Sequence, residues 1–119
     1  MSLKKTVTET FTFEAAHYIT GDRPEYADWH GHSHVVNVTV QGDLQMPFGW
    51  IIEQSKFREI VNLEIEKIDH TLLNQKMENT TAEGIAMYLW QKLRTEFPKG
   101  VSLESVEVCK TTTKAKIEK

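Results

Sequence analysis

The chain contains a single cysteine, Cys109, among 119 residues. One thiol excludes an intramolecular disulfide and a zinc site made of several cysteines, so any bound metal must be held by histidine and carboxylate side chains. Long apolar runs are also missing, because the longest, such as residues 50–52, are far too short to cross a bilayer. The N-terminus lacks the apolar segment and cleavage site of a signal peptide. We therefore expect one globular domain over residues 1–119, located in the cytoplasm and without a membrane partner.

A charge excess of one sign is nearly absent. The formal net charge is -3, and lysines and glutamates are interspersed along the chain. No basic stripe is present that would follow a phosphate backbone, which disfavours nucleic acid as a partner. The chain is also small for a deep, self-contained active site, so a small-molecule site shared between subunits of a homo-oligomer fits its size.

Two strands are predicted in the first third of the chain. Hydrophobic and polar residues alternate from Val7 to His17, which is typical of a β-strand whose apolar face ends at His17. Residues 20–29 contain glycine, proline and acids without periodicity and indicate a loop. A second strand begins within the stretch His30-Gly31-His32-Ser33-His34 and continues in alternating valines, so we expect an antiparallel pair.

Helices are predicted in the middle of the chain. Apolar residues at three- and four-residue steps predict a helix from roughly Ser55 to Ile68. The stretch Thr80-Thr81-Ala82-Glu83 fits a capping box at the start of a second amphipathic helix, which residues 98–100 (Pro-Lys-Gly) end.

The C-terminal segment completes the expected fold. Residues 101–112 alternate again and predict at least one more strand, whereas the lysine-rich end, residues 114–119, reads as a solvated tail. The order of strands, two helices and strand predicts an α+β fold with an antiparallel sheet.

Three of the five histidines lie within five residues of one another. His30 and His32 are two positions apart, so their rings project from the same face of a strand, and His17 can join them from the neighbouring strand. Three neutral imidazoles leave a fourth position on Zn²⁺ for water or substrate, which is the catalytic type of zinc site. Surface histidines, or an adventitious metal site, are the alternatives. His34 has the same parity but lies further from His17, and we place it next to the ligands.

Several short motifs occur in a fixed order along nearly the whole chain. They are Phe13-Glu14-Ala15-Ala16-His17, His30-Gly31-His32-Ser33, Gly49-Trp50-Ile51-Ile52-Glu53, Ile68-Asp69-His70-Thr71-Leu72-Leu73-Asn74 and Thr80-Thr81-Ala82-Glu83. In this order they resemble the 6-pyruvoyl-tetrahydropterin synthase and 6-carboxytetrahydropterin synthase family. The resemblance implies a T-fold, which is an antiparallel sheet with two helices on one face that associates into oligomeric barrels, commonly hexamers.

The resemblance also implies roles for individual residues. It implies zinc on the histidine ligands proposed above and a substrate such as 7,8-dihydroneopterin triphosphate. Asp69 and His70 match the Asp-His pair of the family, in which the carboxylate orients the imidazole; because adjacent residues at a helix end do not face one another, we expect Asp69 to serve a His70 on another subunit. Favourable placement of His70 at a helix C-terminus is the alternative. Thr81 and Glu83 correspond to positions that line the pterin pocket, although a helix cap also explains them.

One departure from the family removes its catalytic base. Members carry a cysteine a few residues before the His-Gly-His motif, or, in a subgroup that releases 6-hydroxymethyl-dihydropterin, a glutamate three residues before its first histidine. Here that position is Ala27. Glu25 or Asp28 is the candidate replacement, and an ordinary surface loop is the alternative.

A second departure lies in the last predicted strand, where the family has a glutamate that holds the pterin edge. The corresponding residue is Lys110, which can only donate hydrogen bonds and so cannot accept them from the pterin N–H groups. Lys110 instead suits an anionic ligand or a solvated edge. The sequence thus predicts a zinc-dependent lyase acting on a dihydroneopterin triphosphate-like substrate; the alternative is a divergent homologue that keeps the fold and zinc but has another substrate or no catalysis.

Overall fold

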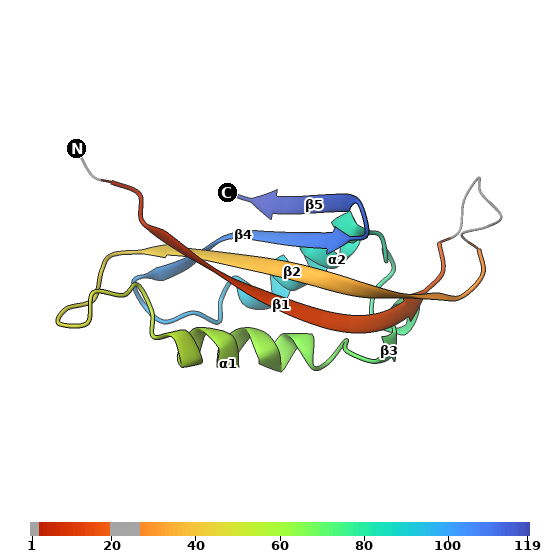
Figure 1. Ribbon diagram of the computed structural model, residues 1–119, viewed down its shortest axis with the longest axis horizontal. Coiled ribbons are helices and arrows are strands. Elements are labelled where there is room, and N and C mark those ends of the chain that lie inside the picture. The colour runs from red at the N-terminus through yellow and green to blue at the C-terminus, as the bar shows by residue number, and fades with distance from the viewer. Residues whose placement is uncertain (1–2, 20–26) are drawn as a thin grey trace.

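The structure is a computed structural model that describes residues 3–19 and 27–119. Its elements in chain order are β1 (Thr6–His17), β2 (His30–Gly42), α1 (Gln54–Ile65), β3 (Thr71–Leu72), the short 3-10 helix η2 (Leu73–Gln75), α2 (Ala82–Leu93), β4 (Val101–Lys110) and β5 (Thr113–Glu118). The end of β1, the start of β2 and the short strand β3 lie together at one end of the molecule, and the turn between β2 and α1 lies at the other (Figure 1).

The five strands form one sheet in the order β3-β1-β2-β4-β5. Strands β1 and β2 pair antiparallel along their whole length, from Thr6 opposite Gln41 to His17 opposite His30. The pairs β2–β4 and β4–β5 are also antiparallel, and only the two-residue strand β3 runs parallel to its neighbour β1. The expected antiparallel sheet is therefore confirmed.

Both helices pack on the same face of this sheet, α1 against β1 and α2 against β4 and β5 (Figure 1). Period-two alternation brings one apolar set of side chains from each strand to this face, and the helices bury it. The fully buried residues between the two layers include Val36, Val38, Phe57, Ile85 and Leu89. The prediction of two helices on one face is confirmed.

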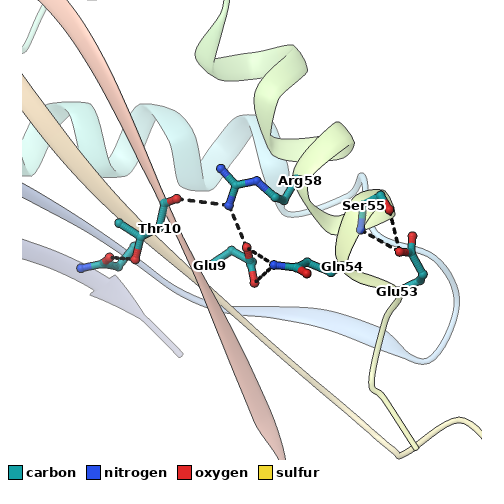
Figure 2. Close-up of polar contacts among 7 residues, drawn as sticks. Glu9, Thr10, Glu53, Gln54, Ser55 and Arg58 are labelled. Carbon is teal, nitrogen blue, oxygen red and sulfur yellow. Dashed lines mark hydrogen bonds and ion pairs between the residues drawn. The ribbon is translucent and has the colours of Figure 1, made fainter. Parts of the chain in front are cut away.

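Helix α1 is held to β1 by polar contacts at its first turn. The carboxylate of Glu53 caps the helix by accepting from the backbone N–H groups of Ser55 and Lys56 at 3.0 and 2.9 Å (Figure 2). One turn later the guanidinium of Arg58 pairs with Glu9 of β1 at 2.7 Å. These contacts fix the direction in which the helix crosses the sheet.

The predicted end of the first helix was wrong by three residues. Helix α1 ends at Ile65, and the backbone N–H groups of Ile68 and Asp69 both donate to the Ile65 carbonyl, at 3.0 and 2.9 Å. This tight turn still carries Ile68 into the core, where it is fully buried. The apolar spacing therefore continues past the helix although the helix does not.

The N-cap of the second helix also lies one residue later than the predicted capping box requires. The N-cap is Thr81, whose hydroxyl accepts from the backbone N–H of Gly84 at 3.1 Å. Glu83 consequently lies one position too early to return a bond to the cap. Thr80 is not the cap because it is buried and faces β1, where its hydroxyl donates to the Tyr18 carbonyl at 3.3 Å.

The C-terminal tail is not solvated as expected but forms strand β5. Ala115 is buried and Ile117 is partly buried against the core, while Lys114 and Lys116 point to the opposite side. Lysines at every second position are compatible with an edge strand, because only one face of it needs to be apolar.

The sheet face away from the helices is polar. Thr10 donates to Asn37 at 2.7 Å and Asn37 donates to Glu107 at 2.9 Å, so a row of hydrogen bonds crosses three strands. We call this surface the open face. Within residues 3–19 and 27–119, no helix has the length and apolar character needed to span a membrane.

Candidate metal centre and acid–base pair

The three predicted metal ligands meet where β1 ends and β2 begins. His17 is paired with His30 in the sheet register, and His32 is paired with Ala15, so all three rings lie on the helix-covered face. The ring centroid of His17 is 4.5 Å from that of His30 and 5.1 Å from that of His32. The antiparallel register thus brings together residues that are 13 and 15 positions apart in the chain.

The orientation of two rings is set by backbone carbonyls. The Nδ1 atom of His17 lies 2.8 Å from the carbonyl oxygen of Thr80, and that of His30 lies 2.9 Å from the carbonyl of Asp28. A carbonyl can only accept, so each Nδ1 must carry the proton and each Nε2 keeps a free lone pair. Nε2 of His17 is buried and has no hydrogen-bond partner among the described residues.

This donor set fits a divalent transition metal. One ring nitrogen from each of His17, His30 and His32 can be chosen so that all three lie within 4.8 Å of one another. Burial is the main cause that lowers the pKa of His17, to about 4, and it also lowers the pKa of His32. Two of the three rings are therefore held in the neutral form that binds metal.

Two residues that hold this cluster in place were not singled out from the sequence. Thr80 orients His17 through its backbone carbonyl. Asn74 accepts from the backbone N–H of Tyr18 and donates to the Tyr18 carbonyl, both at 3.0 Å, which fixes the chain directly after His17. A backbone contact carries no side-chain signature, so nothing in the sequence indicated Thr80, and Asn74 was visible only as a member of the 68–74 motif.

Asp69 and His70 form a pair within one chain, contrary to the expectation that they would have to pair across subunits. Nδ1 of His70 lies 3.0 Å from Oδ1 of Asp69. His70 adopts a left-handed backbone conformation with φ of 58°, which turns its ring back toward the preceding residue. Asp69 also accepts from the backbone N–H of Glu14 at 2.9 Å, so the pair is anchored to β1.

A pocket of about 720 Å³ adjoins this pair. His70 lines it together with Glu14 and Ser33, which belong to the open face because they alternate with Ala15 and His32. The ring of His70 is 78% exposed. His32 also lines this pocket, so one proposed ligand and His70 border the same cavity within one chain.

The remaining predicted residues fall into three groups. Glu25 lies outside the described residues. Asp28 contributes its backbone carbonyl to His30, and its own side chain is exposed. Thr81 acts as the helix cap, and Glu83, exposed in the first turn of α2, raises the pKa of Lys110.

Lys110 lies next to the histidines. It is directly opposite His34 in the pairing of β2 with β4, on the helix-covered face, and burial lowers its pKa. Cys109 points to the other face, where it lies 3.7 Å from Glu107. Neither Cys109 nor Glu107 therefore shares a face with Lys110.

Comparison with known proteins places this arrangement in a family. The model of the 6-pyruvoyl tetrahydropterin synthase family matches residues 6–118. A dihydroneopterin monophosphate aldolase of Pyrococcus furiosus is 27% identical over 106 residues, which cover 89% of this chain and 90% of that protein. A candidate 6-carboxy-5,6,7,8-tetrahydropterin synthase of Archaeoglobus fulgidus is 32% identical over 103 residues, or 87% of this chain and 85% of that protein.

A solved structure agrees with the sequence matches. The 6-pyruvoyl tetrahydropterin synthase of Caenorhabditis elegans superimposes with a TM-score of 0.85 at 21% identity, over 98% of this chain and 96% of that one. This likeness establishes the T-fold. Together with the family match over nearly the whole sequence, it shows that the chain belongs to the 6-pyruvoyl tetrahydropterin synthase family of pterin-biosynthesis enzymes.

Proposed function

We propose that the protein is a zinc-dependent lyase that breaks a carbon–oxygen or carbon–carbon bond in the side chain of dihydroneopterin triphosphate or a related dihydroneopterin phosphate. The observation that carries this proposal is the convergence of His17, His30 and His32 within 4.8 Å. Three neutral imidazoles without a cysteine are typical of zinc sites that keep a position open for water or substrate. The aldolase name of the Pyrococcus furiosus relative supports a dihydroneopterin phosphate as substrate.

The proposed metal would act as a Lewis acid that polarises oxygen atoms of the substrate side chain and makes neighbouring protons easier to remove. The protein's own task is then to move protons. His70, held by Asp69 at 3.0 Å, is the exposed imidazole suited to this work, because the carboxylate orients the ring and stabilises its charged form. Asp28 or Glu25 would serve as the base that replaces the missing cysteine, and Thr81 and Glu83 would contact the pterin.

We infer that complete sites form between chains of a homo-oligomer, as in the hexamers implied by the family resemblance. Two observations support this inference. The side chain of His70 is 78% exposed, which leaves its imidazole open to a neighbouring chain. In addition, β3 covers only Ala15 and Ala16 of β1, so most of that edge has no partner strand among the described residues.

The oligomer can be tested by mixing two inactive variants. In His32→Ala the proposed metal site is damaged, and in His70→Ala the proposed acid–base group is missing. If sites are shared, refolding the two variants together restores part of the activity, whereas either alone stays inactive. A monomer at micromolar concentration in sedimentation velocity, or no recovery on mixing, would contradict the inference.

The reaction can be tested by product analysis. Zinc-loaded protein is incubated with dihydroneopterin triphosphate and, separately, with dihydroneopterin monophosphate, and products are identified by liquid chromatography and mass spectrometry. Carbon–carbon cleavage of the monophosphate yields 6-hydroxymethyl-dihydropterin and glycolaldehyde phosphate, whereas carbon–oxygen cleavage of the triphosphate releases inorganic triphosphate. Chelator-treated protein and His32→Ala serve as controls. Absence of products from both substrates would contradict the proposal.

The second candidate is a divergent homologue that keeps the fold and zinc but acts on another small molecule or has lost catalysis. Lys110 favours it, because this lysine occupies the position of the pterin-holding glutamate and lies beside the histidines. Tight pterin binding without turnover, or zinc binding without pterin binding, would favour this candidate over the lyase.

A further inference from the structure

His34 is a buried histidine beside the proposed metal ligands. Its side chain is fully buried, and neither Nδ1 nor Nε2 has a hydrogen-bond partner among the described residues. The ring stacks on Phe13 with centroids 4.6 Å apart, and its centroid is 5.9 Å from that of His32. A neutral imidazole has one donor and one acceptor, and leaving both unpaired in the interior is unfavourable. A ligand group that accepts from one ring nitrogen would remove part of this penalty.

Lys110 is the cross-strand neighbour of His34 and faces the same side. It follows Val106 and Val108 on the core face of β4, so a lysine continues a row of two fully buried valines. In the described part of the chain, no carboxylate lies within ion-pair distance of its ammonium group. A half-buried cation thus adjoins a buried, unpaired imidazole.

The charges near this pair would leave an excess of positive charge once a metal is bound. Burial is the main cause that lowers the pKa of Lys110, and Glu83 opposes that change. A divalent metal on the neighbouring histidines would add further positive charge. This balance favours a negatively charged group on the ligand.

We propose that Lys110 and His34 form an oxyanion subsite beside the histidine cluster, which binds a phosphate or carboxylate group of the substrate. Lys110 supplies a charge and up to three N–H donors, and His34 supplies one ring N–H, so both complement an oxyanion. The inference rests on the proposed function, because it places the anionic group of a reduced pterin in the same site. It assigns to Lys110 the selection of anionic over neutral pterins.

The test is a comparison of ligands that differ in one anionic group. Binding of neopterin, neopterin monophosphate and 6-carboxypterin to the zinc-loaded protein is measured by titration calorimetry. We expect at least one anionic pterin to bind about tenfold tighter than neopterin, the lower end of the coupling energies measured for close charge pairs at interfaces. Preference for the phosphate or for the carboxylate shows which oxyanion the subsite accepts.

Two lysine variants test the assignment. Lys110→Met should abolish the preference for the anionic pterin, whereas Lys110→Arg should retain most of it. Lys114→Met is the matched control: it removes the same charge from the next strand, but its side chain lies on the open face. If the preference survives in Lys110→Met, or is lost equally in Lys114→Met, the subsite is overturned.

Variants of His34 separate binding from packing. His34→Phe keeps an aromatic ring against Phe13 and removes both unpaired nitrogens, so the free protein should unfold at the same or a higher urea concentration. The preference for the anionic pterin should nevertheless fall. His34→Gln, which retains a donor and an acceptor, should keep more of it. A His34→Phe protein with undiminished preference would show that His34 is only a packing residue and would overturn its part in the subsite.

The two proposals fail in different ways. Inorganic phosphate alone is added to zinc-loaded protein, and the melting temperature is followed in the parent and in Lys110→Met. If no pterin binds but phosphate raises the melting temperature of the parent only, the proposed function fails and the subsite stands. If pterins bind and react equally well with and without the anionic group, the function stands and the subsite fails.

Discussion

Strand β2 has two halves that share one face but differ in chemistry. Its helix-covered face carries first three histidines, His30, His32 and His34, and then three valines, Val36, Val38 and Val40. All three valines are fully buried. Strand β4 changes at the same level, where Val106 and Val108 give way to Lys110. The boundary between the apolar core and the candidate site therefore lies at the same level on both strands.

The comparison shows how one alternating pattern serves two purposes. In the valine half every side chain is apolar, and burial alone stabilises the fold. In the histidine half the same positions hold nitrogen atoms, and both ring nitrogens of His34 are buried without a hydrogen-bond partner among the described residues. Such groups destabilise the free protein, but they are held rigidly by the adjoining core. The site is thus an extension of the core surface rather than a separate loop structure.

The largest expected effect in the histidine half comes from removing one of the proposed metal-binding histidines. His17→Ala should weaken zinc binding by more than about 100-fold, because even the outer partners of metal ligands change affinity by about 10- to 100-fold. Zinc affinity is measured by competition with a chromogenic chelator, and zinc content by elemental analysis. His30→Ala and His32→Ala should behave alike. A variant that binds zinc as well as the parent would remove that residue from the ligand set.

The corresponding change in the valine half should act on stability instead. Val38→Ala should lower the free energy of unfolding by about 1–3 kcal/mol, because it opens a cavity in a fully packed core. Its zinc stoichiometry should remain that of the parent. Urea unfolding and elemental analysis on the same preparation check both statements. Loss of zinc in Val38→Ala would show that the two halves are not separable.

The sequence predicted the features that follow from alternation. Strand β1, strand β2, their pairing and the convergence of His17 with His30 and His32 all result from period two and an antiparallel register. The early end of α1 was not predictable in the same way, because Ile68 keeps the helical spacing while it lies in a turn. Strand β5 was missed because its lysines dominate the composition, although Ala115 and Ile117 alternate with them.

Features that depend on distant backbone were beyond the sequence. The role of Thr80 depends on its carbonyl, which meets His17 63 residues earlier in the chain. The Asp69–His70 contact depends on a left-handed backbone at His70, a conformation that no pattern in the sequence indicates. The candidate ligands could therefore be predicted, whereas the groups that orient them required the structure.

A substitution of Lys110, which lies at the boundary between the two halves, tests whether this residue contacts the pterin. Lys110→Glu places an acceptor where the family holds the pterin edge, so neopterin or sepiapterin should bind about tenfold tighter or more, since a buried unpaired donor is unfavourable by about 1–3 kcal/mol. Zinc content should not change. Binding of an anionic pterin should weaken in the same variant, which reverses the preference of the parent. If the parent already binds neutral pterins tightly and Lys110→Glu has no effect, Lys110 is outside the pocket.

The smallest expected effect concerns the hydrogen bond that attaches Asp69 to β1. Its carboxylate accepts from the Glu14 N–H at 2.9 Å, and this bond is the main cause that lowers the pKa of Asp69 below its usual 3.8, with His70 adding to it. Because the folded-state pKa lies below that of the unfolded chain, the ionised carboxylate stabilises the fold above pH 3.8, and this contribution is lost as the pH falls below that value. The side chain is 35% exposed, so solvent screens the effect.

Asp69→Asn keeps an acceptor for Glu14 but has no charge to lose. The difference in urea midpoint between parent and Asp69→Asn, measured at one protein concentration, should therefore shrink as the pH falls below 3.8. A difference that stays constant through the acid range would show that the neutral amide holds β1 as well as the carboxylate does.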